Sequence, residues 1–212
     1  MKKKDAIIFD LDGTLWDAAE TIAPAWNRYL ESRGIGLRMT PDSCRACCGK
    51  TLPEIAELLF PEAPANWREA VVDGCCEAEC VPLSRHGGKL YPGEEAVLTA
   101  LKERYFLAVV SNCGLGYIEA FFSGNGTGEY FDDYENAART GLSKGGNIRL
   151  VMERNGLEKA VYVGDTEGDR AAAREAGVPF VHAGYGYGQA ADADGRIYSL
   201  SELPALLQKL FR

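Results

Sequence analysis

Short apolar runs that end at a polar residue recur along this chain of 212 residues. The first is DAIIFD at 5–10, which Asp10 closes. Runs of this kind, apolar throughout and not alternating with polar side chains, are typical of strands buried on both faces of a sheet. Similar runs follow at 106–111 (FLAVVS), 161–164 (VYVG), 178–181 (VPFV) and, more weakly, 196–199 (RIYS). We therefore expect these five segments to be strands of a buried sheet.

Helical patterns separate these runs. Gly156 and Gly177 stand where two of the patterns end, and glycine is a common helix stop. Strands that alternate with helices predict an α/β fold, in which a parallel sheet is covered by helices on both faces. The expected helices occupy 94–104, 147–154, 169–176 and a last segment that begins at Ser201.

Residues 17–88 break this alternation. They are mostly helical in pattern and include no convincing buried strand, and Gly87-Gly88 marks a flexible connection to the next segment. We interpret them as a helical insertion, the cap segment, between the first strand and the rest of the sheet. The predicted division is a core domain of residues 1–16 and 89–212 and a cap domain of residues 17–88.

The charge balance narrows the range of partners. The chain has 23 Lys and Arg against 31 Asp and Glu, a net charge of −8. Nucleic acid and anionic membrane surfaces favour basic proteins, so we expect neither as a partner. The longest uncharged stretches, 176–191 and 105–118, are 16 and 14 residues long, whereas a membrane-spanning helix needs roughly 18 or more apolar residues.

The start of the chain and its cysteines bear on the compartment. MKKKDAIIFD begins with a basic stretch, but Asp10 ends the apolar run, so we expect no signal peptide. Without an export signal, we expect reduced thiols and a cytoplasmic protein. Six of the seven Cys lie in the cap segment, in C-x₂-C and C-x₃-C spacings. Such spacings could hold zinc or mark redox-sensitive thiols, but they also suit a helix core, which we favour.

Polar side chains gather where the predicted strands end. In open α/β sheets, ligands bind at the carboxyl edge of the strands. Carboxylates placed together repel one another unless a cation lies among them, and oxygen ligands favour Mg²⁺. A cation with a nearby ammonium and hydroxyl would bind phosphate, and a carboxylate can attack phosphorus to form an aspartyl-phosphate. The residues are Asp10, Asp12, Ser111, Asn112, Asp165 and Asp169, with Lys144 at a predicted helix start.

Four motifs extend this pattern over nearly the whole chain. They are FDLDGTLWD at 9–17, VVSNCG at 109–114, Lys144, and VGDTEGD at 163–169. In order and spacing they resemble the motifs of the haloacid dehalogenase superfamily of phosphatases. The helical insertion resembles the subgroup that includes phosphoglycolate phosphatase-like and β-phosphoglucomutase-like enzymes. The resemblance implies a Rossmann-like parallel sheet with an inserted α-helical cap.

The resemblance also implies a role for each catalytic motif residue. Asp10 would be the nucleophile, and Asp12 would be the general acid and base that protonates the leaving oxygen and then activates water. Ser111, supported by Asn112, would hold a phosphoryl oxygen. Lys144 would neutralise the phosphoryl group and the attacking carboxylate.

A Mg²⁺ ion is the cofactor that the resemblance implies. Asp10, Asp165 and the backbone carbonyl of Asp12 would bind it. Thr14 would help to orient the region of the nucleophile, and Asp169 would orient Lys144 or metal-bound water.

Three positions bear on the shape of the pocket. Trp16 follows the DGTL stretch, where smaller residues are common, and we expect it near the hinge, where it would narrow the pocket. Gly145 follows Lys144 where many relatives have Pro, so we expect a looser helix start. Lys50 lies in the loop 48–52 (CGKTL) of the cap segment and could meet a second anionic group of the substrate; a solvated lysine is the alternative.

Each motif residue also has a purely structural interpretation. Asp10 and Asp12 could mark a solvated strand end, and Ser111 could be a hydrogen-bonding group there. Lys144 could be a surface lysine, and Asp169 an acid favoured at a helix N-terminus. The presence of all motifs at the required places favours the catalytic interpretation.

The function that these residues favour is Mg²⁺-dependent hydrolysis of a small soluble phosphate monoester. A phosphomutase acting on a sugar phosphate would use the same first step, and a non-catalytic ligand-binding protein could use the same scaffold. The expected partner is a small phosphorylated metabolite; phosphoglycolate, a nucleotide, a sugar phosphate and pyrophosphate all stay open. For the oligomeric state, a monomer is our default.

Overall fold

A computed structural model describes residues 5–211; residues 1–4, the basic part of the rejected signal region, lie outside the described residues. The described part contains a six-stranded sheet with the order β5-β4-β1-β6-β7-β8. Every neighbouring pair in it runs parallel, which confirms the expected fold class. The strands are β1 (Ala6–Phe9), β4 (Phe106–Ser111), β5 (Asp133–Asn136), β6 (Ala160–Gly164), β7 (Phe180–Ala183) and β8 (Gly195–Ile197).

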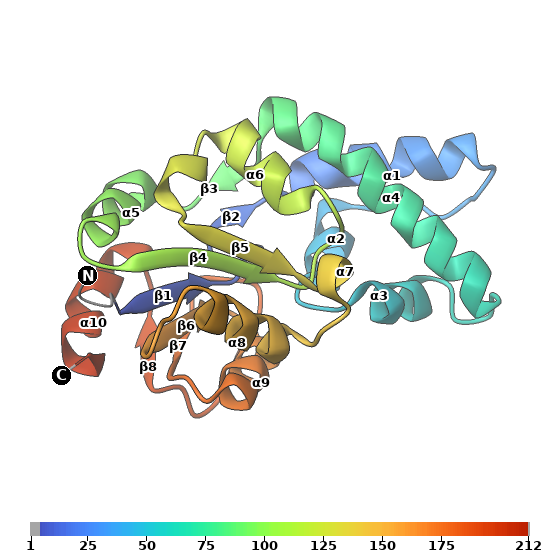
Figure 1. The fold of residues 1–212 in the computed structure, drawn as a ribbon. Helices are drawn as coiled ribbons and strands as arrows, with labels where there is room; N and C mark the ends of the chain where they lie inside the picture. Colours follow the sequence, from blue (N-terminus) through green and yellow to red (C-terminus); the bar gives the residue numbers. More distant parts are fainter. Residues whose placement is uncertain (1–4, 212) are drawn as a thin grey trace.

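β1 lies in the middle of the sheet and packs on both faces. Ile7 and Phe9 belong to one apolar cluster, and Ala6 and Ile8 to a second, because successive side chains of a strand point to opposite faces. The first cluster includes residues of α5 (Glu94–Lys102), α6 (Tyr117–Asn125) and α10 (Leu203–Leu210). The second includes residues of α8 (Lys144–Arg154) and α9 (Glu167–Ala176), on the other side of the sheet (Figure 1).

The cap segment, which the structure describes in full, contains four helices. They are α1 (Ala19–Ser32), α2 (Pro41–Cys47), α3 (Leu52–Leu59) and α4 (Ala65–His86). Thr40 and Thr51 form capping boxes at the starts of α2 and α3, each followed by a proline in the first turn. These helices lie beyond the end of the sheet toward which β4 and β5 point (Figure 1).

The chain crosses between the sheet and these helices at two short strands. β2 (Trp16–Asp17) and β3 (Lys89–Leu90) pair antiparallel. α4 packs against α1 and also against α6, so it contacts both the helical layer and the sheet layer. The division into a core domain and a cap domain stays a prediction.

The sequence pattern does not predict β5 or α6. β5 reads DYEN, and its Asp133 and Glu135 carboxylates both bind Arg154, at 2.7 and 2.6 Å. An edge strand tolerates such charged side chains, because one of its edges has no strand neighbour. Elsewhere the boundaries shift: β7 starts after Pro179, and the last α-helix starts after a short 3₁₀ turn at Leu200–Glu202.

The seven cysteines are free thiols, and Cys44, Cys47, Cys75 and Cys76 lie in the first apolar cluster. Among the described residues, the group of His, Cys, Asp or Glu close enough to share a metal ion consists of three aspartates and no cysteine. Four of the six cap-segment cysteines are therefore core residues, whereas Cys48 and Cys80 are only partly buried. No helix in the described part of the chain is long and apolar enough to cross a membrane.

Candidate active site

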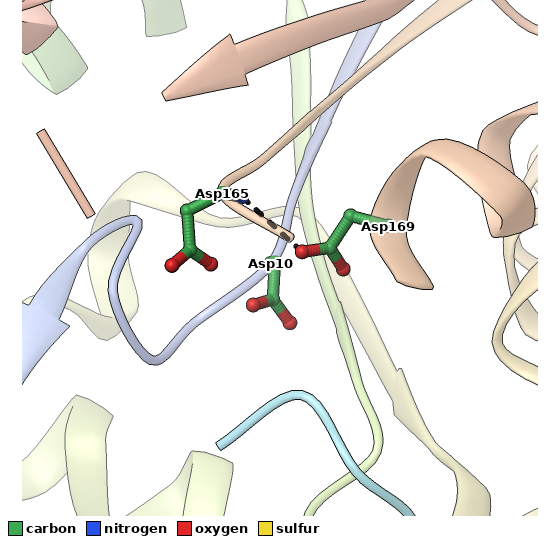
Figure 2. A group of neighbouring side chains, drawn as sticks. All are labelled: Asp10, Asp165 and Asp169. Atoms are coloured by element: carbon green, nitrogen blue, oxygen red, sulfur yellow. Dashed lines mark hydrogen bonds between the residues drawn. The ribbon is translucent and has the colours of Figure 1, made fainter. Parts of the chain in front are cut away.

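Three aspartates meet where β1 and β6 end. Phe9 of β1 pairs with Val163 of β6, so the residues just beyond these strands are neighbours. Asp10, Asp165 and Asp169 each contribute a carboxylate oxygen to a group whose members lie within 4.8 Å of one another. All three are buried, and the backbone N–H of Asp165 donates to Oδ2 of Asp169 at 3.2 Å (Figure 2).

Lys144 supplies the positive charge of this group. Its Nζ lies 2.8 Å from Oδ1 of Asp10 and 2.7 Å from Oδ1 of Asp169. Burial alone would lower the pKa of Lys144, but the two carboxylates raise it well above its usual value. Burial and the charge of Asp169 raise the pKa of Asp10 to about 7, against the opposing effect of Lys144. For Asp169, burial is the largest effect and raises the pKa, but Lys144 and the hydrogen bonds from Thr166 together hold the pKa below its usual value.

The start of α8 is well defined, contrary to the looser start that we expected from Gly145. The hydroxyl of Ser143 caps the helix by accepting from the N–H of Gly146 at 3.0 Å. Gly145 packs against α9, where an added Cβ would lie 2.7 Å from Cβ of Glu175. The missing side chain thus lets α8 approach α9 and places Lys144 at the acidic group.

A glycine-rich loop holds Asp165. Its Oδ2 accepts from the backbone N–H groups of Tyr187 and Gly188, at 2.7 and 3.0 Å. A Cβ on Gly186 would lie 2.3 Å from Cβ of Asp165, so only glycine permits this approach. The segment GYGYG at 184–188 therefore fixes one oxygen of Asp165 through its backbone.

The second oxygen of Asp165 fits a cation site. Oδ1 is buried and has no hydrogen-bond partner among the described residues. An unpaired buried oxygen inside a group of carboxylates suits a hard divalent cation. Asp169 is less available, because Lys144 occupies Oδ1 and Thr166 donates to Oδ2 through its N–H and hydroxyl, at 2.9 and 2.6 Å. Asp10 and Asp165 are thus the side chains best placed to hold such a cation.

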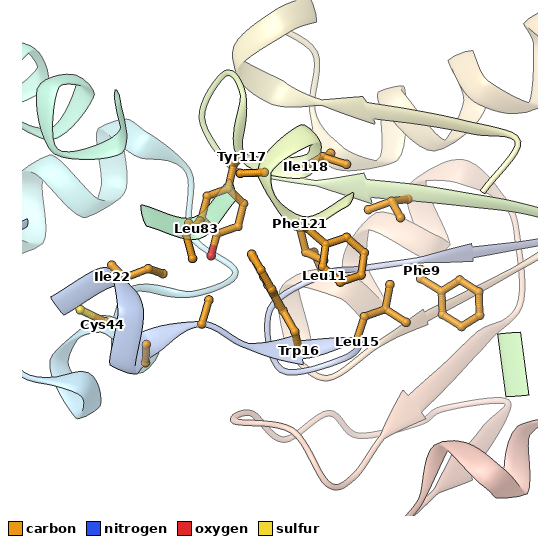
Figure 3. Close-up of a cluster of buried hydrophobic side chains, with 14 of the residues drawn as sticks. Phe9, Leu11, Leu15, Trp16, Ile22, Cys44, Leu83, Tyr117, Ile118 and Phe121 are labelled. Atoms are coloured by element: carbon orange, nitrogen blue, oxygen red, sulfur yellow. The ribbon is translucent and has the colours of Figure 1, made fainter. Parts of the chain in front are cut away.

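Two aromatic side chains hold Asp12. Its Oδ1 accepts from the hydroxyl of Tyr117 at 2.7 Å and from the indole N–H of Trp16 at 2.9 Å. Burial raises the pKa of Asp12 to about 7, and the bond from Tyr117 opposes this shift. Trp16 is fully buried between Tyr117 and Phe121, with ring centroids 5.5 and 4.9 Å away (Figure 3). Trp16 thus lies in β2, near the hinge as expected, but it stands behind Asp12 and does not line the pocket that we expected it to narrow.

The remaining motif residues lie nearby with different contacts. Ser111 ends β4 and is buried. Asn112 donates from Nδ2 to the carbonyl of Gly49 at 3.0 Å, and so joins the strand end to the loop 48–52 of the cap segment. Thr14 is buried, but its hydroxyl has no hydrogen-bond partner among the described residues, and its carbonyl accepts from Tyr185 at 2.8 Å.

This geometry can be compared with known proteins. The family model for haloacid dehalogenase-like hydrolases matches residues 7–183. The chain belongs to this family.

Two relatives of this hydrolase indicate which class of enzyme it is. It is 32% identical to the plasmid-encoded phosphoglycolate phosphatase of Cupriavidus necator, over 95% of this chain and 92% of the relative. It is 29% identical to the phosphoglycolate phosphatase of Rhodobacter capsulatus, over 96% of each. These relationships identify the chain as a phosphatase, and thus as an enzyme rather than a non-catalytic binding protein.

Solved structures show the same fold. A haloacid dehalogenase-like family protein from Streptococcus pneumoniae aligns over 98% of this chain and 100% of its own, with a TM-score of 0.82 and 21% identity. CbbY from Rhodobacter sphaeroides, solved in complex with phosphate, aligns over 97% of this chain and 99% of its own, with a TM-score of 0.79 and 23% identity.

A cavity of about 60 Å³ separates the strand ends of this hydrolase from the cap segment. Asp12, Ser111, Asn112 and Tyr117 line it from the sheet side. Lys50 lies on its wall but is exposed, and its ammonium donates to the carbonyl of Ala46 at 2.9 Å. The amine is therefore engaged with the backbone of its own segment, as a solvated lysine at the edge of the cavity would be.

Sequence reasoning missed two contributors to this site, Tyr117 and Glu79. Tyr117 lies on α6, which no apolar run predicts. Glu79 of α4 lines the cavity and is buried, although an acidic residue in a helix usually faces solvent. His182 is also buried, and its Nε2 lies 3.0 Å from the carbonyl oxygen of Asp165.

Proposed function

We propose that this phosphatase hydrolyses a small phosphate monoester through an aspartyl-phosphate on Asp10, with Mg²⁺ as its cofactor. The observation that carries the proposal is the environment of Asp10. One oxygen, Oδ1, is paired with Lys144, and the unpaired Oδ1 of Asp165 belongs to the same group. A nucleophilic carboxylate needs this combination, because neutralising charges let it approach an anionic phosphoryl group.

The first step forms a bond between a carboxylate oxygen of Asp10 and phosphorus, and the bond from phosphorus to the ester oxygen breaks. Lys144 offsets the negative charge of the phosphoryl group and the nucleophile. Asp12 gives a proton to the leaving oxygen, so the product departs as an alcohol. Asp12 then accepts a proton from the water that cleaves the aspartyl-phosphate. Tyr117 and Trp16 hold Asp12 in one orientation for both transfers.

The cofactor fits the acidic group. When bound by Asp10, Asp165 and the backbone carbonyl of Asp12, Mg²⁺ would neutralise phosphoryl oxygens and the attacking carboxylate. Ser111 and Asn112 would contact the phosphoryl group from the end of β4. Asp169 would keep Lys144 in place, as its 2.7 Å contact supports.

The cap segment, residues 17–88, would act as a separate cap domain that excludes water during the first step. The bond from Asn112 to the carbonyl of Gly49 supports this role, because it joins the two parts across the site. Opening of this contact would release the alcohol and admit the water for the second step.

The test is hydrolysis of a panel of small phosphate esters with and without Mg²⁺. Phosphoglycolate belongs in the panel, because two relatives are named for its hydrolysis. Asp10→Asn should lower kcat by at least about 10³-fold, while far-UV circular dichroism and the unfolding transition stay those of a folded protein. Substantial remaining turnover in the folded variant would refute a nucleophilic role for Asp10.

A further inference from the structure

The cap side of the cavity is acidic. Glu79 of α4 lines it and is only 4% exposed, and the indole N–H of Trp26 donates to its Oε2. Asp12 lies on the wall from the sheet side. Among the described residues that line this cavity, Lys50 is the one Lys or Arg, and its ammonium is exposed and bonded to the backbone. The wall therefore offers two carboxyl groups and no buried cation.

Most of the remaining wall is apolar or aromatic. It includes Trp26, Tyr117, Ile22, Ile55, Met39 and several cysteine thiols. A second anionic group on the substrate, whether a carboxylate or a further phosphate, would lose its hydrating water in this cavity. It would meet no guanidinium or free ammonium there. Burying a charge without a partner is costly, and the neighbouring carboxyl groups would add repulsion. The cavity thus disfavours an alcohol portion that carries a negative charge.

The same wall suits a positive charge. Burial raises the pKa of Glu79 well above its usual value, with the bond from Trp26 as a weaker opposing effect. A positively charged group of a bound ligand would stabilise the ionised form of this buried carboxyl group. Aromatic rings such as those of Trp26 and Tyr117 also attract cations. Since about 10–15 Å³ of such space holds one water, about 60 Å³ accommodates a group of only a few heavy atoms.

We propose that the substrate is the phosphate monoester of a short amino alcohol, and that Glu79 is the counter-ion of its ammonium group. This inference rests on the proposed phosphatase function and names the substrate class of the same site. It departs from the substrate for which the two relatives are named, because phosphoglycolate carries a carboxylate as a second anionic group beside its phosphate. Asp10 and Lys144 would treat the phosphoryl group alike in either ester, and Glu79 would discriminate between the alcohol portions.

The test compares three esters of nearly equal size with the intact protein and Mg²⁺. They are 2-aminoethyl phosphate, 2-hydroxyethyl phosphate and phosphoglycolate, whose alcohol portions are cationic, neutral and anionic. We expect kcat/KM for the aminoethyl ester to exceed that for the hydroxyethyl ester by at least about tenfold, with phosphoglycolate lowest. A tenfold difference in kcat/KM corresponds to a contact that contributes about 1.4 kcal/mol. Equal values, or a higher value for either of the other esters, would overturn the inference.

Glu79→Gln tests the residue itself. Glutamine has nearly the same shape and still accepts from Trp26, so the fold should be kept. The variant should lose at least about tenfold in kcat/KM on the aminoethyl ester and change by less than about threefold on the hydroxyethyl ester. Glu77→Gln is the matched control, because Glu77 is exposed on the same helix and does not line this cavity. A parallel loss on both esters in Glu79→Gln would indicate a structural role and contradict the inference.

The two proposals fail in different ways. Hydrolysis that depends on Asp10 but shows the reverse order of esters would leave the phosphatase mechanism intact and remove only the amino alcohol. Absence of Asp10-dependent hydrolysis of all three esters would overturn both. If Glu79→Gln does not fold, the order of the three esters with the unmodified protein still decides the substrate class.

Discussion

The hydroxyl of Tyr117 lies 2.7 Å from Oδ1 of Asp12, although the two residues are 105 positions apart in sequence. The contact joins the first turn of α6 to the loop after β1. Because Trp16 donates to the same oxygen, both donors act on one side of the carboxyl group. We infer that α6 serves as a positioning element for the proposed general acid.

Tyr117→Phe should therefore lower kcat by roughly tenfold or more, since a hydrogen bond to a charged group contributes about 1.5–3 kcal/mol. The bond from Tyr117 lowers the pKa of Asp12, so its loss should raise that pKa and move one limb of the pH–rate profile to higher pH. Tyr134→Phe is the control, because its hydroxyl binds Glu119 on the surface at 3.0 Å. Equal effects of the two variants would argue against the positioning role.

Lys144→Met should destabilise the protein strongly. The substitution leaves Asp10 and Asp169 buried without their shared cation, and breaking a buried ion pair in this way costs about 3–5 kcal/mol. Lys102→Met removes a partly exposed pair with Asp132 and should cost less than about 1 kcal/mol. Urea unfolding of both variants measures the difference. A loss of less than about 1 kcal/mol for Lys144→Met would contradict the strong pairing seen in the structure.

The stability of the metal-free protein should fall as pH rises from about 4 to about 7. Burial and neighbouring carboxylates raise the pKa of Asp10 to about 7 and that of Asp165 to about 6, from an unfolded value of 3.8. The folded state therefore keeps these protons after the unfolded state has lost them, and this advantage disappears as pH passes the folded pKa values. Thermal unfolding in a chelating buffer across this range measures the slope.

Addition of Mg²⁺ should reverse that loss, because metal ions bind the deprotonated carboxylates. The rise in Tm on adding Mg²⁺ should be larger at pH 8 than at pH 5, and Asp165→Asn should remove most of it. The same rise at both pH values, or a rise that Asp165→Asn does not affect, would place the ion elsewhere.

Gly186→Ala should impair the site without unfolding the sheet. Its Cβ would lie 2.3 Å from Cβ of Asp165 and 2.4 Å from the carbonyl oxygen of Gly13, so the loop that holds Asp165 must move. We expect at least about a tenfold loss in kcat/KM, together with a weaker response of Tm to Mg²⁺. Gly36→Ala is the matched control, since a Cβ there meets no atom within 4 Å. Normal kinetics in Gly186→Ala would show that the loop tolerates the displacement.

The sequence predicts those site residues that directly follow a buried strand. Asp10, Ser111 and Asp165 stand at the ends of apolar runs, and a parallel sheet brings such ends to one edge. The motif residues can therefore be found from their positions after these runs. In the structure, Lys144 contacts Asp10 and Asp169, and Asp165 lies within 4.8 Å of both aspartates.

The rest depends on contacts between distant segments. Tyr117 meets Asp12 because the fold brings α6 to the loop after β1, and Glu79 is buried where α4 packs against α1 and α6. β5 has no apolar run because it is an edge strand whose acidic side chains bind Arg154. Trp16 lies near the hinge, as its position in the motif predicts, but its aromatic neighbours hold it behind Asp12 and away from the pocket that it was expected to narrow.

The pairing of β2 with β3 has a consequence for engineering. Asp17, where the cap segment begins, stands opposite Lys89, the first residue after it. The two ends of the cap segment therefore lie side by side, so another helical segment could be joined to the rest of the chain at these two points. Asp10 and Lys144 lie outside the exchanged segment and would be kept. On the roles proposed for Glu79 and Asp10, substrate choice would depend on residues 17–88 and the phosphoryl chemistry on residues outside them, so a chimera that replaces this one continuous stretch should change specificity and keep the nucleophile.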